Sequence, residues 1–316
     1  MKRLVLIDGN AVLHRAYHAI PPLTAPDGSV VNAVYGFGSM ILRLIHDLKP
    51  SHVAVAFDRP APTFRKKLFI GYQAKRPPLD DALIEQIPKV HELLTGFGIP
   101  IFEMDGFEAD DVVGTLAHNR KKEGIDQVII VTGDRDILQL VEDENVLVYM
   151  PTKGLSEAKL YGEKDVMERM GVAPNKIPDF KALAGDQSDN YPGVEGVGPK
   201  TAASLVNRFG SVDAVYKALE KGAKTTELSE GLVAKLTAGK ESALLSHNLA
   251  TIRTNVPISG SLVPLGSLNR PEAVKELTKL GFRTMLKRIT GEELPAKTGK
   301  MKEKTGKKSD EQQELF

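Results

Sequence analysis

Short runs of apolar, β-branched residues alternate with longer segments of helical periodicity in the first half of the chain. Such alternation is typical of βαβ units, in which helices cover both faces of a mostly parallel sheet. The runs that predict strands lie at residues 3–7, 52–57, 99–104, 127–132 and 145–150. The expected fold class is therefore α/β, with a mostly parallel central sheet.

Beyond residue 150 the apolar positions follow a helical period, so we expect a second, all-helical region. The helices predicted there lie at residues 163–170, 178–183, 200–209 and 212–219. Gly210 should end the third of these helices, and Ser211 should cap the fourth. The expected domains are an α/β core over residues 1–170 with an excursion from the sheet at about 64–97, a helical region over 171–291, and a disordered tail over 292–316.

Composition narrows the possible functions. The chain has 316 residues, of which 41% are hydrophobic and 26% charged, and its formal net charge is +1, so no overall charge indicates a polyanionic partner. It contains no cysteine, which excludes disulfides, thiolate zinc sites and cysteine nucleophiles. The apolar run at residues 4–7 is too short for a signal peptide or a membrane span. We expect a cytoplasmic monomer without a membrane partner.

Acidic residues follow four of the predicted strands. Asp8, Asp58, Glu108 and Asp134 each come soon after a strand, and the carboxyl ends of strands in an open α/β sheet line the ligand crevice. Taken singly, such acids are also explained by helix N-termini and polar turns. The nine carboxylates expected to share the crevice are Asp8, Asp58, Glu108, Asp110, Asp111, Asp134, Asp136, Asp186 and Asp189.

Repulsion within such a cluster predicts bound cations. A close pair of like charges costs about 4 kcal/mol at a separation of about 4 Å and an effective dielectric of about 20. Carboxylate oxygens without cysteine or a histidine cluster select hard ions, so we expect Mg²⁺, with Mn²⁺ as a substitute. Two such ions about 4 Å apart can stabilise both the attacking and the leaving oxygen in phosphodiester hydrolysis.

Two segments indicate contacts with nucleic acid. Residues 64–76 interleave basic with aromatic side chains, which suits phosphate contact and base stacking on a single strand; a solvated helix face is the alternative. Residues 193–202 are a glycine-rich turn before a helix expected to begin at Pro199, which suits duplex phosphates; a plain helix–turn–helix joint is the alternative. The residues expected to contact DNA are Lys66, Lys67, Tyr72, Gly193, Gly196, Val197, Gly198, Lys200 and Thr201.

These motifs, in this order, resemble the 5′ nuclease family, most closely the 5′→3′ exonuclease domain of bacterial DNA polymerase I and the related flap endonucleases. The similarity runs over residues 2–258 and includes Leu-Ile-Asp8-Gly-Asn, Ala-Phe-Asp58, Glu108-Ala-Asp-Asp, Thr-Gly-Asp134-Arg-Asp136 and Gly185-Asp-Gln-Ser-Asp-Asn. The resemblance implies a PIN-like core and two metal groups. The first group would contain Asp8, Asp58, Glu108, Asp110 and Asp111, and the second Asp134, Asp136, Asp186 and Asp189.

The resemblance also implies two DNA-binding elements. Residues 64–97 would form a helical arch that admits the 5′ single strand, and residues 196–202 would belong to a helix–three-turn–helix element that grips the duplex and can hold K⁺. The basic residues expected at the scissile or flanking phosphates are Arg15, Arg65, Lys75 and Arg76. Gln73 stands where the family usually has an arch lysine, so Lys75, Lys67 or Arg76 would have to supply that charge, or the rate would suffer.

The last five residues resemble the short motif with which bacterial proteins dock on the sliding clamp. Its anchors would be Gln312, Leu315 and Phe316, and an ordinary tail end is the alternative. No polymerase region follows, so a stand-alone nuclease is expected unless the chain is a fragment.

The expected function is Mg²⁺-dependent, structure-specific 5′→3′ exonuclease and 5′-flap endonuclease activity in replication and repair. The expected substrates are 5′ flaps, nicked or gapped duplexes and Okazaki-type RNA–DNA ends in a bacterial, nucleoid-associated setting. Two rivals are a nuclease homologue that binds DNA junctions without cutting, made conceivable by Gln73, and an acid-cluster phosphatase or ribonuclease. The second rival has no use for the arch or the glycine-rich turn.

Overall fold

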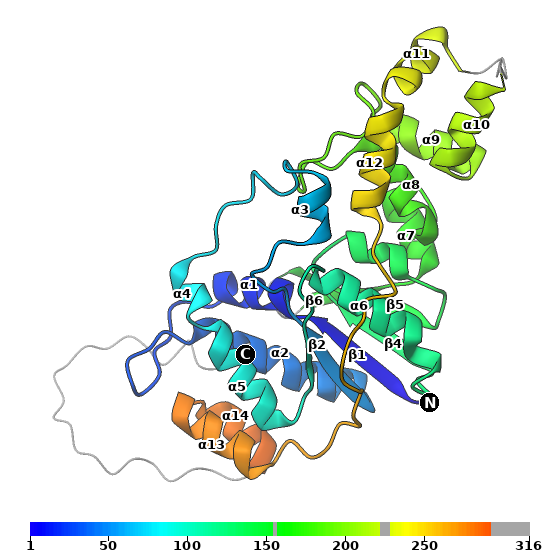
Figure 1. The fold of residues 1–316 in the computed structure, drawn as a ribbon. Coiled ribbons are helices and arrows are strands. Elements are labelled where there is room, and N and C mark those ends of the chain that lie inside the picture. Colours follow the sequence, from blue (N-terminus) through cyan, green and yellow to red (C-terminus); the bar gives the residue numbers. More distant parts are fainter. Residues whose placement is uncertain (154–156, 222–227, 292–316) are drawn as a thin grey trace.

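A twisted central sheet organises the molecule (Figure 1). The computed structural model describes residues 1–153, 157–221 and 228–291, and the sheet order within them is β3-β2-β1-β4-β5-β6. The strands are β1 Arg3–Asp8, β2 His52–Ala56, β3 Ile101–Phe102, β4 Gln127–Val131, β5 Val146–Lys153 and β6 Glu157–Tyr161. Neighbouring strands are parallel except for β5 and β6, which confirms the mostly parallel sheet predicted from the sequence.

Helices cover both faces of this sheet. Those that follow the strands are α1 Gly9–Ala19, α2 Asn32–Leu48, α5 Ile87–Phe97, α6 Ala109–His118, and the short 3₁₀ helices η1 Asn119–Lys121 and η2 Asp136–Leu140. Alternate residues of β1 enter different cores: Leu4 and Leu6 pack with α6, whereas Val5 and Ile7 pack with α1, α2 and α5. Burial on both faces explains why these strands are continuous apolar runs in the sequence.

The helical region lies at one end of the sheet. It contains α7 Glu163–Met170, η3 Pro174–Lys176, α8 Ile177–Ala184, α9 Pro199–Phe209, α10 Val212–Glu220, α11 Glu230–Ala238 and α12 Lys240–Ala250. The predicted boundaries are confirmed at three points. Pro199 is the first residue of α9, Gly210 ends it with φ 87°, and the Ser211 hydroxyl accepts a hydrogen bond from Ala214 N–H at 3.1 Å.

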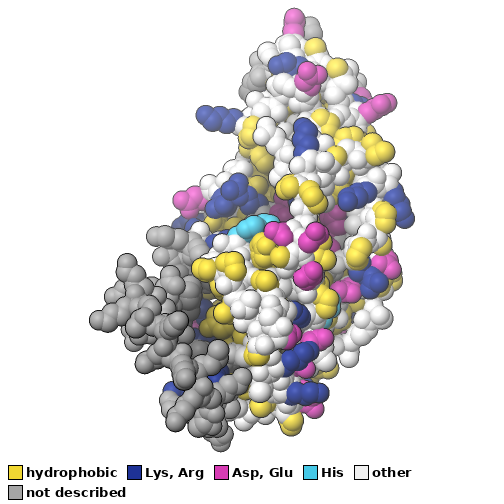
Figure 2. All heavy atoms as spheres, turned by 90° about the vertical axis from the view of Figure 1, so that its left-hand side faces the viewer, with side chains coloured by type: hydrophobic (Ala, Val, Ile, Leu, Met, Phe, Trp, Pro, Cys, Tyr) yellow, Lys and Arg dark blue, Asp and Glu magenta, His cyan; other side chains and the backbone are white. Residues whose placement is uncertain are grey.

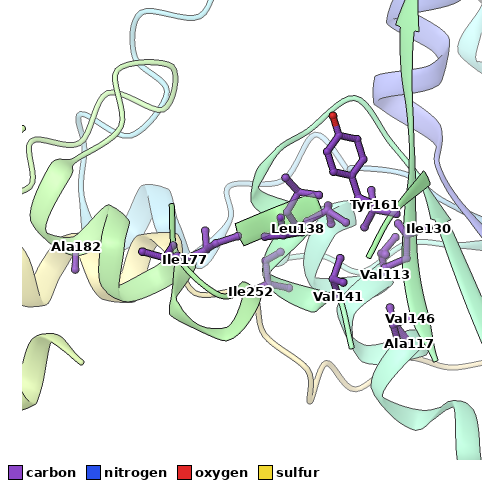
Figure 3. Close-up of a cluster of buried hydrophobic side chains, with 14 of the residues drawn as sticks. Val113, Ala117, Ile130, Leu138, Val141, Val146, Tyr161, Ile177, Ala182 and Ile252 are labelled. Atoms are coloured by element: carbon purple, nitrogen blue, oxygen red, sulfur yellow. The ribbon is translucent and has the colours of Figure 1, made fainter. Parts of the chain in front are cut away.

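One apolar cluster joins the helical region to the sheet. Figure 3 shows Ile177 and Ala182 of α8 in the same row of side chains as Leu138, Val113 and Ile130. All five are essentially excluded from solvent. The end of the sheet that carries the acidic residues is therefore held firmly against α8.

The prediction of helices alone beyond residue 150 is wrong at β6, which pairs antiparallel with β5. The segment 157–161 reads Glu-Ala-Lys-Leu-Tyr, and Lys159 and Leu160 are exposed on the edge of the sheet. An edge strand needs no apolar run, so the sequence carried no strand signal there. β3 is also shorter than predicted, with two residues instead of six.

The excursion from the sheet is shorter than the predicted span of 64–97. It begins with α3 Phe64–Leu68 and continues through α4 Asp81–Ile84. The following helix, α5, returns to the core, where Val90, Leu93 and Leu94 are completely buried. Residues 87–97 therefore cover the sheet and do not belong to an arch.

The end of the described chain also returns to the core. Helices α13 Pro271–Leu280 and α14 Arg283–Thr290 pack beside α5 and α2, far from α9 and α10 (Figure 1). The expected helical region over 171–291 is thus interrupted, because residues 271–290 belong to the layer that covers the sheet. None of the helices in the described parts of the chain is long and apolar enough to cross a membrane.

Candidate active site

Three neighbouring strands bring acidic residues to one edge of the sheet. β1 ends at Asp8, Asp58 lies just beyond β2, and β4 leads through Thr132 to Asp134. Because β2, β1 and β4 are adjacent and parallel, their carboxyl ends lie side by side. The Asp8 carboxylate accepts hydrogen bonds from Ala11 N–H at 3.0 Å and from the Thr132 hydroxyl at 2.7 Å, so it is fixed between β1 and β4.

The N-terminus of α6 adds three more acids to this edge. Glu108 is the N-cap residue, and Asp110 and Asp111 lie in the first turn. The Asp58 carboxylate accepts a hydrogen bond from Ala109 N–H at 2.7 Å, which attaches the start of the helix to the end of β2. Negative side chains at a helix N-terminus are stabilised by the helix dipole, so the backbone itself supports the cluster.

Burial raises the pKa values of several of these acids, and repulsion between neighbouring carboxylates adds to the effect. Burial, followed by the charges of Asp134 and Asp8, raises the pKa of Asp110 well above its usual range. Burial raises the pKa of Asp8 to about 6 against the hydrogen bonds that it accepts. Burial raises the pKa of Glu108 to about 7 although the Arg65 guanidinium opposes it. These groups therefore bind protons more readily than free carboxyls do, and a cation placed among them would release those protons.

Asp111 differs from its neighbours because the protein itself saturates its carboxylate. Oδ1 accepts hydrogen bonds from Arg65 Nη2 at 2.9 Å and Arg253 N–H at 2.8 Å, and Oδ2 from Arg65 Nη1 at 2.7 Å and Glu108 N–H at 3.0 Å. The side chain is fully buried. This geometry disagrees with the expected role of Asp111 as an ion ligand, because four hydrogen bonds already occupy its two oxygens.

Arg65 also differs from expectation. It is only 2% exposed, and each of its five N–H donors has a partner in the protein. Besides the two bonds to Asp111, Nη1 donates to Glu108 Oε2 at 3.1 Å, Nε to the Leu249 carbonyl at 2.8 Å, and Nη2 to the Thr251 carbonyl at 3.1 Å. Arg65 therefore fastens α3 and the end of α12 to α6, and it presents no donor to a phosphate.

The second group of acids lies between η2 and the turn after α8. Lys181 of α8 is buried there, and its ammonium forms ion pairs with both Asp136 and Asp186. Burial raises the pKa of Asp136 to about 7 in spite of the Lys181 charge. Burial also acts to raise the pKa of Asp186, but the Lys181 charge prevails and lowers it.

The segment after α3 contacts both groups of acids. Arg76 Nη2 donates a hydrogen bond to Asp189 Oδ1 at 2.6 Å, and the Tyr72 hydroxyl donates to Glu108 Oε2 at 3.1 Å. Gln73 has a left-handed φ of 55°, and its N–H donates to the Asp189 carbonyl at 2.9 Å. Tyr72 is only 3% exposed, so its ring does not offer the predicted stacking surface for bases.

The remaining basic residues of this face are open to solvent to different degrees. Lys66, Lys67 and Lys75 are exposed and form no ion pair with any residue that the structure describes, and Arg15 is half-buried on α1. In Figure 2, Asp and Glu side chains gather at mid-height on the face shown, and Lys and Arg side chains lie above and beside them. Exposed basic side chains thus lie next to the acidic residues on this face (Figure 2).

The glycine-rich turn joins α8 to α9. Gly193 has φ 63°, and a Cβ added to it would lie 2.2 Å from the backbone nitrogen of Gly185. The backbones of these two segments therefore pack so closely that no side chain fits between them. The Gly196 carbonyl accepts a hydrogen bond from Lys235 Nζ at 3.3 Å. Of the residues expected at DNA, the structure exposes Gly196, Gly198 and Lys200, half-buries Thr201, and buries Gly193 and Val197.

The acids offer oxygen ligands alone, which fits a hard divalent ion. Across the described residues, however, no three Asp, Glu or His side chains converge as the ligands of one ion. Basic groups of the chain separate them: Arg65 in the first group, and Arg76 and Lys181 in the second. Asp110 is the exception, since its carboxylate accepts no hydrogen bond from the described residues.

Two models of known protein families match most of the chain. Residues 3–171 match the family model described as 5′-3′ exonuclease, N-terminal resolvase-like domain, and residues 172–272 match 5′-3′ exonuclease, C-terminal SAM fold. The chain belongs to the 5′-3′ exonuclease family. This confirms the family predicted from the motifs, and it assigns the chain to a family of nucleases.

Relatives in this exonuclease family differ in length. The chain is 38% identical over 292 residues to the 5′-3′ exonuclease of Aquifex aeolicus, covering 92% of this chain and 96% of the relative. It is 42% identical over 291 residues to DNA polymerase I of Caldicellulosiruptor bescii, covering 91% of this chain and 33% of the polymerase. The chain thus spans about a third of the length of the polymerase relatives that it matches.

Solved structures confirm the fold of this family member. The T5 5′-exonuclease, solved with bound zinc, aligns with a TM-score of 0.66 at 20% identity over 92% of this chain and 97% of its own. The catalytic core of Rad2 in complex with DNA substrate aligns with a TM-score of 0.56 at 17% identity over 92% and 88%. Both support a PIN-like, resolvase-type domain joined to a helical SAM-fold domain.

Sequence reasoning missed two residues of the candidate site. Lys181 was missed because a lysine in a predicted helix is normally assigned to the solvent face; its position five residues before Asp186 was the available signal. Arg253 was missed because only its backbone N–H acts, at 2.8 Å from Asp111 Oδ1, and any residue could supply that group.

Proposed function

We propose that this chain is a structure-specific nuclease that hydrolyses phosphodiester bonds at DNA 5′ ends and at the base of 5′ flaps by a two-ion mechanism. The observation that carries the proposal is the meeting of carboxylates from β1, β2, α6, η2 and the turn after α8 at one edge of the sheet. The acids in this crevice repel one another, and a cluster with such perturbed pKa values is typical of a functional site that attracts cations.

The acids would hold two hard ions, Mg²⁺ or, as a substitute, Mn²⁺. When bound, the ions would activate a water molecule and neutralise charge on the phosphate. Asp8, Asp58, Glu108 and Asp110 would hold the first ion together with Asp134, which lies between the two groups. The ligands of the second would be Asp136, Asp186 and Asp189, and we assign Asp111 a supporting role through its bonds to Arg65 and Glu108.

The segment after α3 would bring positive charge to the reacting phosphate. Lys75 is exposed beside Arg76, whose guanidinium already reaches Asp189, so the two residues stand at the rim of the acid cluster. They supply the charge that Gln73 lacks in place of the usual arch lysine. Arg15 of α1 would contact a flanking phosphate from the other side, as would Lys66 and Lys67 of α3.

The glycine-rich turn would grip the duplex beyond the cleavage point. Gly196 and Gly198 are exposed, and the N-terminus of α9 with Lys200 offers N–H groups and a positive charge to phosphates. A K⁺ held by backbone carbonyls of this turn belongs to the same proposal. Duplex binding that is equally strong in Na⁺ and K⁺ would remove the K⁺ from it.

The substrates would be 5′ flaps, nicked or gapped duplexes and RNA–DNA primer ends, processed by a monomer in the bacterial cytoplasm. Two solved structures of similar fold support DNA as the partner, since one is a T5 flap endonuclease complex with DNA and metal ions and the other is the Rad2 core with DNA substrate. The clamp motif with Gln312, Leu315 and Phe316 lies outside the described residues, as does the whole tail 292–316. Deleting 312–316 should leave cleavage of naked DNA unchanged and abolish stimulation by a sliding clamp.

A labelled 5′-flap substrate tests the proposed function. The wild type should release short 5′ products with Mg²⁺ and none with EDTA. Asp134→Ala should abolish this release while DNA binding in Ca²⁺ stays intact, because Asp134 raises the pKa of both Asp110 and Asp136 and so lies between the two groups. Asp213→Ala, which removes an exposed surface carboxylate of α10, is the matched control.

A protein that binds junctions without cutting is the second candidate. It is favoured by the ion pairs that already engage Asp136, Asp186 and Asp189, and by the missing arch lysine at Gln73. Flap binding without hydrolysis at any Mg²⁺ concentration would establish it and refute the nuclease. Comparable turnover of a small phosphomonoester would instead indicate a phosphatase.

A further inference from the structure

A buried ammonium group lies inside the second acid group. Lys181 is 6% exposed, and its nitrogen forms ion pairs with Asp136 of η2 and with Asp186 of the turn after α8. These two carboxylates lie on different elements, so the lysine is what joins them. Lys181 is held in place from its own backbone as well, because its carbonyl accepts a hydrogen bond from Gly185 N–H at 2.8 Å.

Lys181 engages the one oxygen of Asp186 that its own turn leaves open, and it engages one of the two oxygens of Asp136. Asp186 Oδ1 is used by its own turn, where it accepts hydrogen bonds from Ser188 N–H at 2.7 Å and Asp189 N–H at 3.1 Å. Asp186 Oδ2 has Lys181 as its partner, and so does Asp136 Oδ1. An ion that used these two oxygens would have to stand where the ammonium stands, since Mg²⁺ binds oxygen at about 2.1 Å.

We infer that Lys181 is a positioning residue that occupies the place of the second divalent ion: it keeps Asp136 and Asp186 together in the ion-free protein, and the ion binds there only by displacing it. The inference rests on the proposed two-ion site. It implies that the first acid group fills first, because Asp110 accepts no hydrogen bond within the described residues, and that the second ion binds weakly until the lysine moves away.

Binding of Mn²⁺ to the full chain without DNA tests this inference by electron paramagnetic resonance of the free ion. Lys181→Met keeps the length and apolar character of the stem and removes the charge. We expect the second Mn²⁺ to bind at least about tenfold more tightly to Lys181→Met than to the wild type, because a unit positive charge no longer opposes it at contact distance. Lys181→Arg should retain the weak second site. Lys217→Met removes an exposed lysine that also pairs with an aspartate, and it should change neither constant.

A second Mn²⁺ constant that is equal or weaker in Lys181→Met would overturn the inference. If the methionine variant does not fold, as judged by its melting curve, the ¹⁵N resonance of the Lys181 ammonium in the wild type takes its place. That resonance should shift as Mg²⁺ fills the second site, and an unshifted signal at saturation would equally refute displacement. Flap cleavage by the wild type is measured separately, so a failure of the proposed nuclease function is distinguishable from a failure of this inference.

Discussion

Replacing Arg65 by alanine should destabilise the whole protein and not only its chemistry. The substitution leaves the Asp111 carboxylate, which is 0% exposed, without either of its guanidinium partners, and it removes a donor from the carbonyls of Leu249 and Thr251. Removing one partner of a buried ion pair typically costs about 3–5 kcal/mol, because the other charge stays buried and uncompensated. At about 2–4 °C per kcal/mol for a protein of this size, the melting temperature should fall by roughly 6–20 °C.

Thermal unfolding in EDTA measures this change without interference from ions. Arg59→Ala is the matched control, because Arg59 pairs with Asp105 at 2.6 Å and Glu103 at 3.2 Å but is 45% exposed. Exposed pairs contribute about 0–1 kcal/mol, so the control should melt within a few degrees of the wild type. The double variant Arg65→Met/Asp111→Leu should recover a large part of the lost stability, since no unpaired charge remains buried.

One result would refute the assignment of Arg65 as a structural clamp. If Arg65→Ala melts within about 1 °C of the wild type, which is a change of well under 1 kcal/mol, and yet loses flap cleavage, then the guanidinium serves the phosphate. That was the role expected from the sequence. The two outcomes are therefore exclusive, and a single pair of measurements decides between them.

The other predictions concern charge. In EDTA the free energy of unfolding should fall as pH rises from about 4.5 to 7.5. In the folded protein Glu108 and Asp136 have pKa values of about 7, so they keep their protons over this range, whereas the same groups in the unfolded chain have lower pKa values and release them. Mg²⁺ should restore stability at pH 7.5 more than at pH 5.5, and a melting temperature in EDTA that rises over this window would contradict the assignment. Lys75→Ala should slow flap cleavage by about 10²-fold with little change of DNA binding in Ca²⁺; an unchanged rate would leave Arg76 as the group that replaces the arch lysine. Lys200→Ala should weaken duplex binding and reduce the salt slope by about one phosphate contact, and an unaltered slope would argue against a grip by α9.

The buried strands of the fold could be predicted from the sequence, whereas the edge strand β6 and the packing of the helix α13 could not. β1, β2 and β4 are buried on both faces, so they are short apolar runs rich in β-branched residues, which favours strands. β6 lies at the edge of the sheet and alternates too weakly to be recognised. The placement of α13 against α5 is a long-range choice, since an amphipathic helix shows that it needs a partner but not which one.

The candidate site could likewise be predicted only in part. The acids follow strands directly, so topology alone brings Asp8, Asp58 and Asp134 to one edge. The basic partners of Asp111, Asp136 and Asp189 come from elements far away in the chain, so no local pattern around these acids identifies them. Sequence reasoning therefore identified the negative charges, assigned two of their positive partners, Arg65 and Arg76, to DNA phosphates, and missed the third, Lys181.

Those positive partners explain how an acid cluster can fold before any ion arrives. Arg65 is 46 residues from Asp111, Lys181 is 45 from Asp136, and Arg76 is 113 from Asp189, so each pair closes only when the tertiary structure is complete. Each pair offsets repulsion that would otherwise oppose folding. Arg65 is buried and also donates to two backbone carbonyls. Arg76 is half exposed, and Lys181 is the only partner of Asp186 Oδ2 among the residues that the structure describes. We therefore expect Arg65 to stabilise the first group of acids whether or not an ion is bound. In the second group, a divalent ion or a phosphate can replace the contacts of Arg76 and Lys181.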